Sequence, residues 1–416
     1  MMDGGVSAKP RVLVICPKYF PVAEGLGHYT TEFCRHLSRV VEVAIWTSRD
    51  RGPVTPASGH PPPASVKLID SVKRWAFWGP FASLRGALAF EPDEILIQFV
   101  PNMYAPKSGI NFTLVLLAWH LARRAQARGK GHVAVMFHEL WYPFGWQPKA
   151  LVLHLSHRAM AFGVALAARD IFCSTERNAS EVRRLLGPLS RSIHVLPVGS
   201  SLERDPAPAP LERPRDERLK LAIFGSLHQS KNTELVLETI REASRESPWK
   251  LELTIVGPTL PELCQAMPEL ASWLEKDVHV AGQLEADEAA DCLAAQDFLV
   301  AYFQDGVSTR RTTLMAALCE GVPVVTTWRD FSDPVFRDRP FVTLLSCDEA
   351  AFRDEFVALM RSRERPFARV SRDEVRSFYR EHFSWSAIVR RFTELSGLAA
   401  PNGQVEARGA QPSSRL

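Results

Sequence analysis

The sequence predicts an α/β protein of two domains, each a doubly wound parallel sheet with helices on both faces. Short, nearly continuous apolar runs alternate with longer stretches of helical periodicity, and this alternation is typical of parallel strands buried on both sides. The alternation occurs twice within 416 residues. At ~100–200 residues per domain, this length corresponds to two or three domains.

In the first half of the chain, seven apolar runs have the length of strands, and helical patterns separate several of them. The predicted strands are 11–16, 41–47, 66–70, 94–99, 132–137, 170–174 and 192–196. The predicted helices are 27–38, 109–128, 147–168 and 175–186. Helical crossovers between strands indicate parallel pairing, because parallel strands need long connections.

The second half repeats this pattern after a segment rich in proline. Its predicted strands are 219–224, 250–256, 277–280, 297–302, 322–326 and 341–344, and its predicted helices are 231–244, 260–274, 286–295, 309–319 and 348–361. We therefore predict a first domain over 1–200, a proline-rich linker over 201–218, a second domain over 219–370, terminal helices over 371–398 and a disordered tail over 399–416.

The composition is that of an ordinary soluble protein, with 46% hydrophobic residues and a formal net charge of +3. This balance excludes a wholly basic nucleic-acid binder and an acidic disordered chain. The charge is unevenly divided: residues 1–200 contain 23 Lys and Arg against 13 Asp and Glu, and residues 201–416 contain 27 against 34. The first half therefore carries +10 and the second −7. No basic run is interleaved with aromatic residues like a nucleic-acid-binding module, so we expect no nucleic-acid partner.

The seven cysteines are scattered and include no C-x-x-C pair. This pattern disfavours a disulfide framework or a zinc ribbon and favours a reducing compartment. The first ten residues lack the apolar core of a signal peptide. The longest apolar runs, 112–122 and 159–168, are shorter than the ~20 residues that span a bilayer. We expect a cytoplasmic protein.

Ligands of doubly wound sheets bind beyond the carboxyl ends of the strands, so the loops after the strands are the candidate sites. Gly25 and Gly27 follow the first strand and allow a sharp turn toward a helix N-terminus. A third glycine of the dinucleotide fingerprint is missing, which argues against a nicotinamide enzyme. His138 follows the strand 132–137 and can transfer a proton or contact a hydroxyl, or else only order its loop.

His154 and His157 are spaced i, i+3 on a predicted helix. This spacing supplies half of a metal site, but no further ligands are evident, so a partly buried helix face is the favoured interpretation. We expect no metal and no cofactor.

In the second half, Gly225 and Ser226 follow a strand, and Lys231 opens the next predicted helix. Lys231 is well placed to meet a diphosphate at a helix N-terminus, although an ordinary surface lysine would leave the same pattern.

The segment after the strand 297–302 contains several candidate ligand-binding residues. Asp305 begins a turn, and Ser308 is the predicted N-cap of a helix that starts at Thr309. Arg310 and Arg311 then fall in the first helical turn, where positive charge opposes the helix dipole. A bound phosphate would remove this conflict. Alternatively, both arginines point to solvent or pair with Asp305.

Taken together, these segments resemble the family 4 glycosyltransferases of the GT-B fold, from residue 11 to about residue 395. The resemblance is carried by Val14-Ile-Cys-Pro-Lys-Tyr-Phe-Pro21, Gly25-Leu-Gly27, His138-Glu139, Leu196-Pro-Val-Gly-Ser200, Phe224-Gly-Ser-Leu with Lys231, Ile255-Val-Gly257, Val280-Ala-Gly282 and Gly321-Val-Pro-Val-Val325. It implies a retaining hexosyltransferase whose second domain binds a nucleotide-diphosphate sugar and whose first domain binds the acceptor. The final helices would cross back onto the first domain, and no divalent metal would be required.

The resemblance also implies a role for each candidate residue. Gly25 and Gly27 would lie near the donor phosphate and the acceptor, His138 would contact the donor sugar, Lys231 would hold the diphosphate and Asp305 would contact the transferred sugar. Gly225, Ser226, Ser308, Thr309, Arg310 and Arg311 complete the predicted donor site.

This chain departs from the family pattern in three places. Ser226 stands where the family commonly has arginine, Ala316 stands where it has a second glutamate, and about three extra residues follow Asp305. We hypothesise that Arg310 or Arg311 replaces the charge that Ser226 lacks.

The predicted function is transfer of a sugar to a saccharide, lipid-linked or small-molecule acceptor in surface polysaccharide or glycolipid biosynthesis. The alternatives are a catalytically degenerate sugar-nucleotide-binding scaffold and another GT-B enzyme, such as a sugar-nucleotide epimerase. The basic, aromatic segment 73–81, from Lys73 to Phe81, further indicates an anionic membrane surface as a partner. The protein would then be peripheral on the inner face of the cell membrane.

Overall fold

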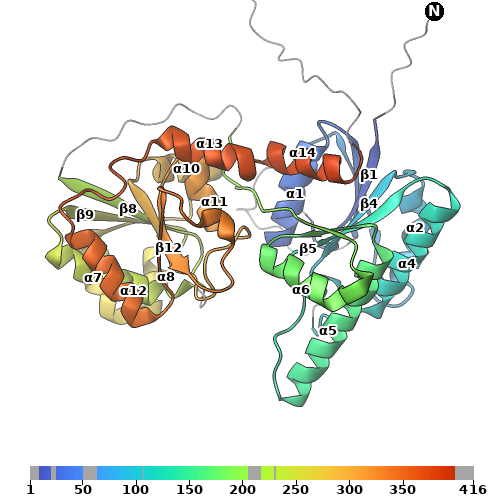
Figure 1. Cartoon of the computed structure of the whole chain (residues 1–416), viewed down its shortest axis with the longest axis horizontal. Coiled ribbons are helices and arrows are strands. Elements are labelled where there is room, and N and C mark those ends of the chain that lie inside the picture. Colours follow the sequence, from blue (N-terminus) through green and yellow to red (C-terminus); the bar gives the residue numbers. More distant parts are fainter. Residues whose placement is uncertain are drawn as a thin grey trace, which may run out of the picture.

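The computed structural model describes residues 9–19, 25–49, 63–105, 107–204, 217–228 and 231–398. Two α/β domains lie side by side, and the helices α13 (Arg372–His382) and α14 (Trp385–Leu395) run along one edge of both (Figure 1). Most of the predicted linker and all of the predicted tail lie outside the described residues.

The first domain contains a seven-stranded sheet in the order β3-β2-β1-β4-β5-β6-β7, and every pair in it is parallel. All seven predicted strands are present. Their bounds are β1 (Arg11–Ile15), β2 (Glu42–Ser48), β3 (Val66–Val72), β4 (Glu94–Phe99), β5 (His132–Phe137), β6 (Asp170–Cys173) and β7 (Ser192–Val195). The strand order reverses direction between β1 and β4, which is where doubly wound sheets place a ligand.

The second domain contains a six-stranded parallel sheet in the order β10-β9-β8-β11-β12-β13. Its strands are β8 (Arg218–Phe224), β9 (Lys250–Val256), β10 (Val278–Gly282), β11 (Phe298–Ala301), β12 (Val324–Trp328) and β13 (Val342–Ser346). The six predicted strands are present here too, and the order reverses between β8 and β11. The prediction of two doubly wound sheets is therefore confirmed.

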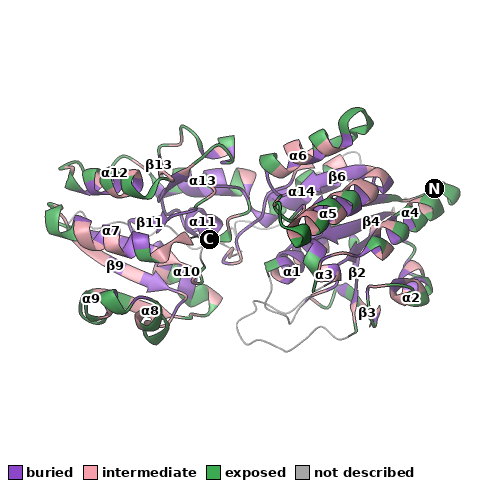
Figure 2. Ribbon diagram, turned by 90° about the horizontal axis from the view of Figure 1, so that it is seen from below, coloured by how far each residue is buried: buried purple, intermediate pink, exposed green. Residues whose placement is uncertain are grey.

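Helices cover both faces of each sheet (Figure 2). In the first domain they are α1 (Gly25–Leu37), α2 (Gly79–Leu88), α3 (Pro101–Tyr104), α4 (Phe112–Ala127), α5 (Pro148–Ala167), α6 (Glu176–Leu186) and the short 3-10 helix η1 (Gly187–Leu189). In the second they are α7 (Thr233–Glu246), α8 (Leu260–Ala266), η3 (Pro268–Leu270), α9 (Ala271–Asp277), α10 (Ala286–Ala294), α11 (Thr312–Cys319), η4 (Pro334–Phe336) and α12 (Glu349–Arg361).

Alternate residues of each strand enter different cores. Leu13 and Ile15 of β1 pack in the layer that α2, α4 and α5 cover, whereas Val12 and Val14 pack in the layer that α1 and α14 cover. This arrangement explains why central strands such as β1, β4 and β5 read as continuous apolar runs, since neither of their faces meets water.

One predicted helix is divided in the structure, and one helix of the first domain was missed. The predicted helix 260–274 is interrupted by η3 and becomes α8 and α9. Pro268 lacks a backbone N–H and begins a new turn. Helix α2 was not predicted, and it begins one residue before Pro80, a position that proline tolerates.

The terminal helices tie the domains together. Helix α13 packs on α11, and α14 packs on α1. Trp385 Nε1 donates to the carbonyl of Ser200 at 2.7 Å, and a Cβ on Gly199 would lie 2.7 Å from the Trp385 ring. The glycine of the segment 196–200 is therefore needed for this close approach.

Candidate functional site

The turn after β8 forms the first part of the site. Gly225 has a φ of +100°, which favours glycine, and its amide donates to the carbonyl of Val256 at 2.9 Å. A Cβ at this position would lie 2.7 Å from Lys231 Nζ. The turn therefore lets the ammonium group of Lys231 approach the backbone, while Ser226 lies exposed beside it.

Lys231 connects this turn to α11. Its Nζ donates to Thr313 Oγ1 at 3.3 Å, and Thr313 Oγ1 also lies 3.4 Å from the carbonyl oxygen of Phe224. Burial lowers the pKa of Lys231, and the charge of Arg311 lowers it further. Two cations are thus held close enough to repel each other, and such a pair is stabilised by a bound anion.

The loop after β11 brings Asp305 and both arginines together. Arg310 lies 3.3 Å from Asp305, and Arg311 pairs with the other carboxylate oxygen of Asp305. The guanidinium of Arg311 also lies 4.5 Å from the centre of the Phe303 ring. The structure therefore shows the arrangement that the sequence left open as an alternative, in which both arginines pair with Asp305.

The predicted start of the following helix is wrong. Helix α11 begins at Thr312, its N-cap is Arg311, and Ser308 does not cap it. The hydroxyl of Ser308 is buried without a hydrogen-bond partner among the described residues. The helix starts late because Thr309 is bound elsewhere. The arginines consequently precede the first turn, where an anion bound at the helix N-terminus would meet them.

Thr309 links this loop to the first domain. Its hydroxyl lies 2.7 Å from the carbonyl of Ser174, and its carbonyl accepts from the amide of Val198 at 3.1 Å. The Asp333 carboxylate accepts from the Thr309 amide at 2.6 Å and from the Glu176 amide at 3.0 Å. Burial raises the pKa of Asp333. Sequence reasoning missed Asp333, because it lies in a loop that shows no periodicity or motif.

His138 lies beyond the end of β5 in the first domain. Its Nε2 lies 2.7 Å from Gln98 Oε1, and its ring packs edge-to-face with the ring of Tyr29 at 4.5 Å between ring centres. The His138 carbonyl accepts from the hydroxyl of Ser174 at 3.4 Å. Burial lowers the pKa of His138 to about 3. The imidazole is therefore neutral near pH 7 and offers a hydrogen bond rather than a charge.

Ser174 connects the loop after β11 to the end of β5. Its hydroxyl donates to the carbonyl of His138, and its carbonyl accepts from the hydroxyl of Thr309. Gly25 is the first residue of α1, and a Cβ there would meet no atom within 4 Å. Gly27 is buried, and its carbonyl accepts from Thr31 Oγ1 at 2.8 Å. Within the part of the chain that the structure describes, neither glycine forms a hydrogen bond with the second domain, so their roles stay predictions.

A cavity of about 20 Å³ lies between Gly225, Lys231 and Thr313, beyond the carboxyl ends of β8 and β11. This volume holds about one water molecule.

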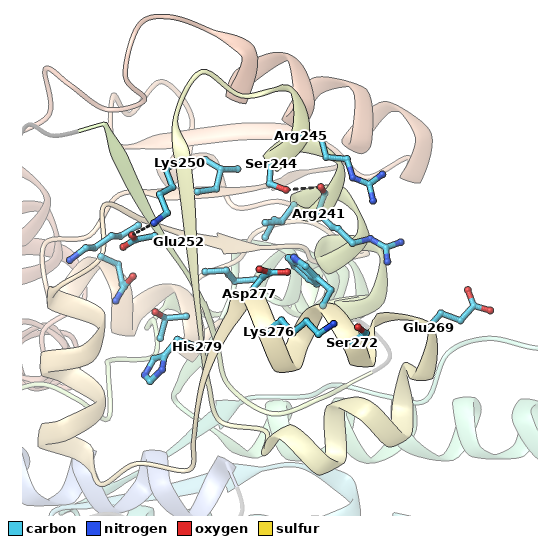
Figure 3. A pocket seen from close by; sticks show the side chains of 17 residues that line it. Arg241, Ser244, Arg245, Lys250, Glu252, Glu269, Ser272, Lys276, Asp277 and His279 are labelled. Carbon is cyan, nitrogen blue, oxygen red and sulfur yellow. Dashed lines mark hydrogen bonds and ion pairs between the residues drawn. The ribbon is translucent and has the colours of Figure 1, made fainter.

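A much larger cavity of about 1090 Å³ lies near the amino ends of β8, β9 and β10 (Figure 3). Its labelled charged side chains, among them Arg241, Lys250 and Lys276, are spread along the walls and do not converge on one point. It also lies at the opposite ends of the strands from the switch point, so the small cavity is the better candidate site.

The described part of the chain contains no group of three or more His, Cys, Asp or Glu side chains that would hold a metal ion. The basic side chains Lys231, Arg310 and Arg311 supply the positive charge of the site instead. Such a site suits an anion that brings two negative groups, such as a diphosphate.

Comparison with known families agrees with this geometry. Residues 218–362 match the family described as Glycosyl transferases group 1. The match covers the second domain, including Gly225, Lys231, Asp305 and both arginines, but not the first domain. A comparison with curated protein sequences gives no significant match.

Several solved structures share the whole architecture. The chain resembles sucrose-phosphate synthase from Thermosynechococcus elongatus with a TM-score of 0.64 and 15% identity, over 93% of this chain and 98% of that one. Anabaena HepE, solved with UDP and glucose, gives a TM-score of 0.60 and 11% identity over 93% and 99%. WaaG, a glycosyltransferase of lipopolysaccharide biosynthesis, gives 0.56 and 14% over 92% and 99%.

The fold is GT-B. The structural likeness establishes the arrangement of both domains, and the family match concerns the second domain alone. Together they support a glycosyltransferase of the GT-B type.

Proposed function

We propose that this protein is a retaining glycosyltransferase of family 4 that transfers a sugar from a nucleotide-diphosphate sugar to a hydroxyl acceptor. One observation carries the proposal. Lys231 and Arg311 lie together beside the Gly225 turn, at the switch point of a sheet that matches a glycosyltransferase family.

The second domain would hold the diphosphate. Lys231, Arg311 and the amides at the start of α11 would stabilise the negative charge that develops as the bond between the sugar C1 and the diphosphate oxygen breaks. Arg310 is more exposed than Arg311 and would contribute to the charge stabilisation from the edge of the site. Because Asp305 pairs with both arginines in the structure, these ion pairs would open when the diphosphate binds, and Asp305 would turn to a sugar hydroxyl.

The first domain would bind the acceptor and support the sugar. His138 is neutral, so its ring would donate or accept a hydrogen bond at a sugar hydroxyl. The acceptor oxygen would form its bond to C1 on the face that the diphosphate leaves. The bond electrons would remain on the diphosphate, whose departing oxygen would take the acceptor proton. No metal enters this scheme.

Relatives of similar architecture support these substrate classes. HepE was solved with UDP and glucose, and WaaG acts in lipopolysaccharide biosynthesis. We therefore propose a role in surface polysaccharide or glycolipid assembly in the cytoplasm, peripheral to the membrane.

The first test is nucleotide binding. Thermal unfolding with UDP, GDP and ADP sugars should identify one donor class by a raised Tm, and mass spectrometry with added acceptors should identify the product. Lys231→Ala should weaken binding of that nucleotide sugar by about 10–100-fold, since a charge-assisted hydrogen bond contributes ~1.5–3 kcal/mol. Lys276→Ala, an exposed lysine of the same domain, is the matched control. Equal donor affinity in both variants would contradict the proposed site.

The same assays separate the two alternatives. Ser226 and Ala316 replace charged residues of the family pattern, which favours a binding scaffold as the second candidate. Donor binding without transfer or hydrolysis would support the scaffold. Conversion of the donor sugar to its epimer without an acceptor would support an epimerase.

A further inference from the structure

The first domain displays apolar side chains on a projection that begins just after His138. Helix α5 extends beyond the body of the domain (Figure 1), and the loop before it folds back along its first turns. Three aromatic side chains of this loop face solvent: Trp146 is 87% exposed, Phe144 54% and Tyr142 46%. A loop that leaves three aromatic rings exposed to solvent is unusual on the surface of a soluble protein.

Hydrogen bonds hold this loop in place. The carbonyl of Tyr142 lies 2.8 Å from His154 Nδ1, and the amide of Tyr142 donates to His157 Nδ1 at 3.2 Å. The other ring nitrogen of His157 bonds to the carbonyl of Ser108. Phe144 contacts both Trp146 and His154. The two histidines that resemble half a metal site therefore serve to present the aromatic rings outward.

The exposed apolar surface continues across the neighbouring helices. On α5, Val152 and Leu155 are more than half exposed, and Phe112, Leu116 and Trp119 form a stripe along α4 at helical spacing. Trp119 Nε1 donates to the carbonyl of Gly163 in α5, so the two helices are joined at this stripe.

The segment 73–81 adjoins the same surface. Phe77 and Trp78 are 75% and 78% exposed, and Phe81 contacts both Trp78 and His120 of α4. Phe77 also has a φ of +56°, a conformation that costs a bulky residue free energy. The chain therefore keeps an apolar side chain outward in a strained position.

We define the docking face as the exposed apolar side chains Phe77, Trp78, Phe112, Leu116, Trp119, Tyr142, Phe144, Trp146, Val152 and Leu155. The segments that carry these side chains are basic. The segments 71–90 and 101–168 together contain ten Lys and Arg but one acidic residue, Glu139. Among the described residues, Lys73, Arg74, Arg123, Arg124 and Lys149 form no ion pair with an acidic side chain, so their charge is available to an external partner.

We propose that the docking face binds the surface of an anionic lipid bilayer. Aromatic side chains with an apolar body and a polar edge suit the headgroup region, and unpaired Lys and Arg attract anionic lipids. A protein partner would have to supply acidic groups on every side of a large apolar patch, whereas an anionic bilayer supplies both properties together. The segment 73–81 is thus one part of a larger surface, most of which lies on α4 and α5.

The protein would lie on the bilayer and not cross it. Among the helices of the described residues, α5 alone has the length and hydropathy of a membrane span, and a third of its most apolar window is buried. Met160, Ala161, Val164 and Ala165 pack into the core of the domain. The exposed turns of α5 are therefore those that would enter the interface.

This placement has a consequence that rests on the proposed function. Residues 139–147 connect His138 to the start of α5 and reach at most ~36 Å when extended, so the acceptor side of the site would lie within that distance of the lipid surface. A lipid-linked acceptor could then be reached without leaving the bilayer.

The test is co-sedimentation of the full chain with vesicles at low salt. Binding to mixed phosphatidylcholine and phosphatidylglycerol should exceed binding to phosphatidylcholine alone by about tenfold or more and should fall with added salt. The double variant Phe144→Ser with Trp146→Ser, and the variant Leu155→Ser, should each bind several-fold less. Leu189→Ser is the matched control, since Leu189 is 55% exposed and Leu155 is 57% exposed.

Reversing the charge of basic residues provides an independent test of vesicle binding. Lys149→Glu together with Arg124→Glu should reduce binding to anionic vesicles, whereas Lys276→Glu in the second domain should not. Every variant should keep the unfolding temperature and nucleotide affinity of the parent protein, so this test is distinct from that of the proposed function.

Three results would overturn the proposal. They are equal binding to neutral and anionic vesicles, unchanged binding of all face variants, or a dimer in solution that Trp146→Ser converts to a monomer. The last would show that a second copy of the chain covers the face.

Discussion

The two regions that meet at Ser174 differ in the state of their polar groups. In the second domain, Lys231 and Arg311 are partly buried cations whose pKa values are lowered by burial, and Arg311 pairs with Asp305. In the first domain, His138 is neutral, with a pKa lowered to about 3, and it bonds to the amide oxygen of Gln98. The region in the second domain holds cations before any ligand binds, whereas His138 in the first domain is uncharged.

This difference indicates that the two regions bind different parts of the substrates. Two partly buried cations raise the free energy of the folded protein until an anion binds beside them. The second domain is therefore suited to bind a negatively charged group. A neutral imidazole beside an amide is prepared for a hydroxyl, because it discriminates by hydrogen-bond direction and not by charge. If this interpretation is correct, substitutions in the second domain should act on donor affinity and those in the first on transfer.

The largest effect is expected at Arg311. Its side chain is 14% exposed and the Arg310 side chain 39%, so Arg311 is held more firmly and is less screened by water. Arg311→Ala should weaken nucleoside diphosphate binding by about 30–100-fold, and Arg310→Ala by about 3–5-fold. Isothermal titration calorimetry would measure both.

The comparison between the arginines has its own control. Arg329→Ala removes a neighbouring guanidinium that donates to the carbonyl of Gln304 and has no ion pair among the described residues. Its donor affinity should stay within about twofold of the parent protein. Should Arg310→Ala and Arg311→Ala both bind normally, the idea that they replace the missing arginine at position 226 fails.

His138→Gln should reduce the transfer rate by about tenfold, while nucleoside diphosphate affinity stays unchanged. The substitution should also alter the pH dependence of stability. Between its usual value and about 3, His138 binds a proton only in the unfolded chain, so falling pH lowers the free energy of unfolding. His138→Gln removes this contribution and should flatten that part of the curve by on the order of 4 kcal/mol between pH 7 and pH 3.

Urea denaturation at a series of pH values from 3 to 7 measures the stability effect, and His154→Gln is a control on the same domain. An unchanged pH profile would show that His138 titrates normally in the folded chain. Weakened nucleotide binding would show instead that the two regions are not separate in function.

The strands and most helices could be predicted because their signals are local. Continuous apolar runs predicted all thirteen strands of the two sheets. The break at Pro268 was also local, and the helical periodicity on either side obscured it. The links through Thr309 and Asp333 could not be predicted, because they join residues far apart in the chain. The late start of α11 follows from those links, and so does the wrong N-cap.

The candidate site could be predicted in part. Glycine turns and basic residues after strands identified Gly225, Lys231 and Arg311 from the sequence. Whether the arginines pair with Asp305 or bind an anion depends on side-chain geometry, which no spacing rule determines. The docking face was predicted only at its segment 73–81, because the exposure of α4 and α5 depends on how far each helix extends beyond its neighbours.

The smallest effect is expected at Ser226, where the family pattern has arginine. Ser226 is exposed beside Gly225, so Ser226→Arg should tighten nucleoside diphosphate binding by about 2–5-fold, as for one partly screened ion pair. The informative experiment combines it with Arg311→Ala. If Arg311 supplies the charge that position 226 lacks, the added arginine should restore part of the lost affinity, and the two changes should not be additive. Ser226→Gln tests whether length alone suffices. Strict additivity in the double variant would mean that the two positions contact different parts of the nucleotide, and the compensation hypothesis would then be wrong.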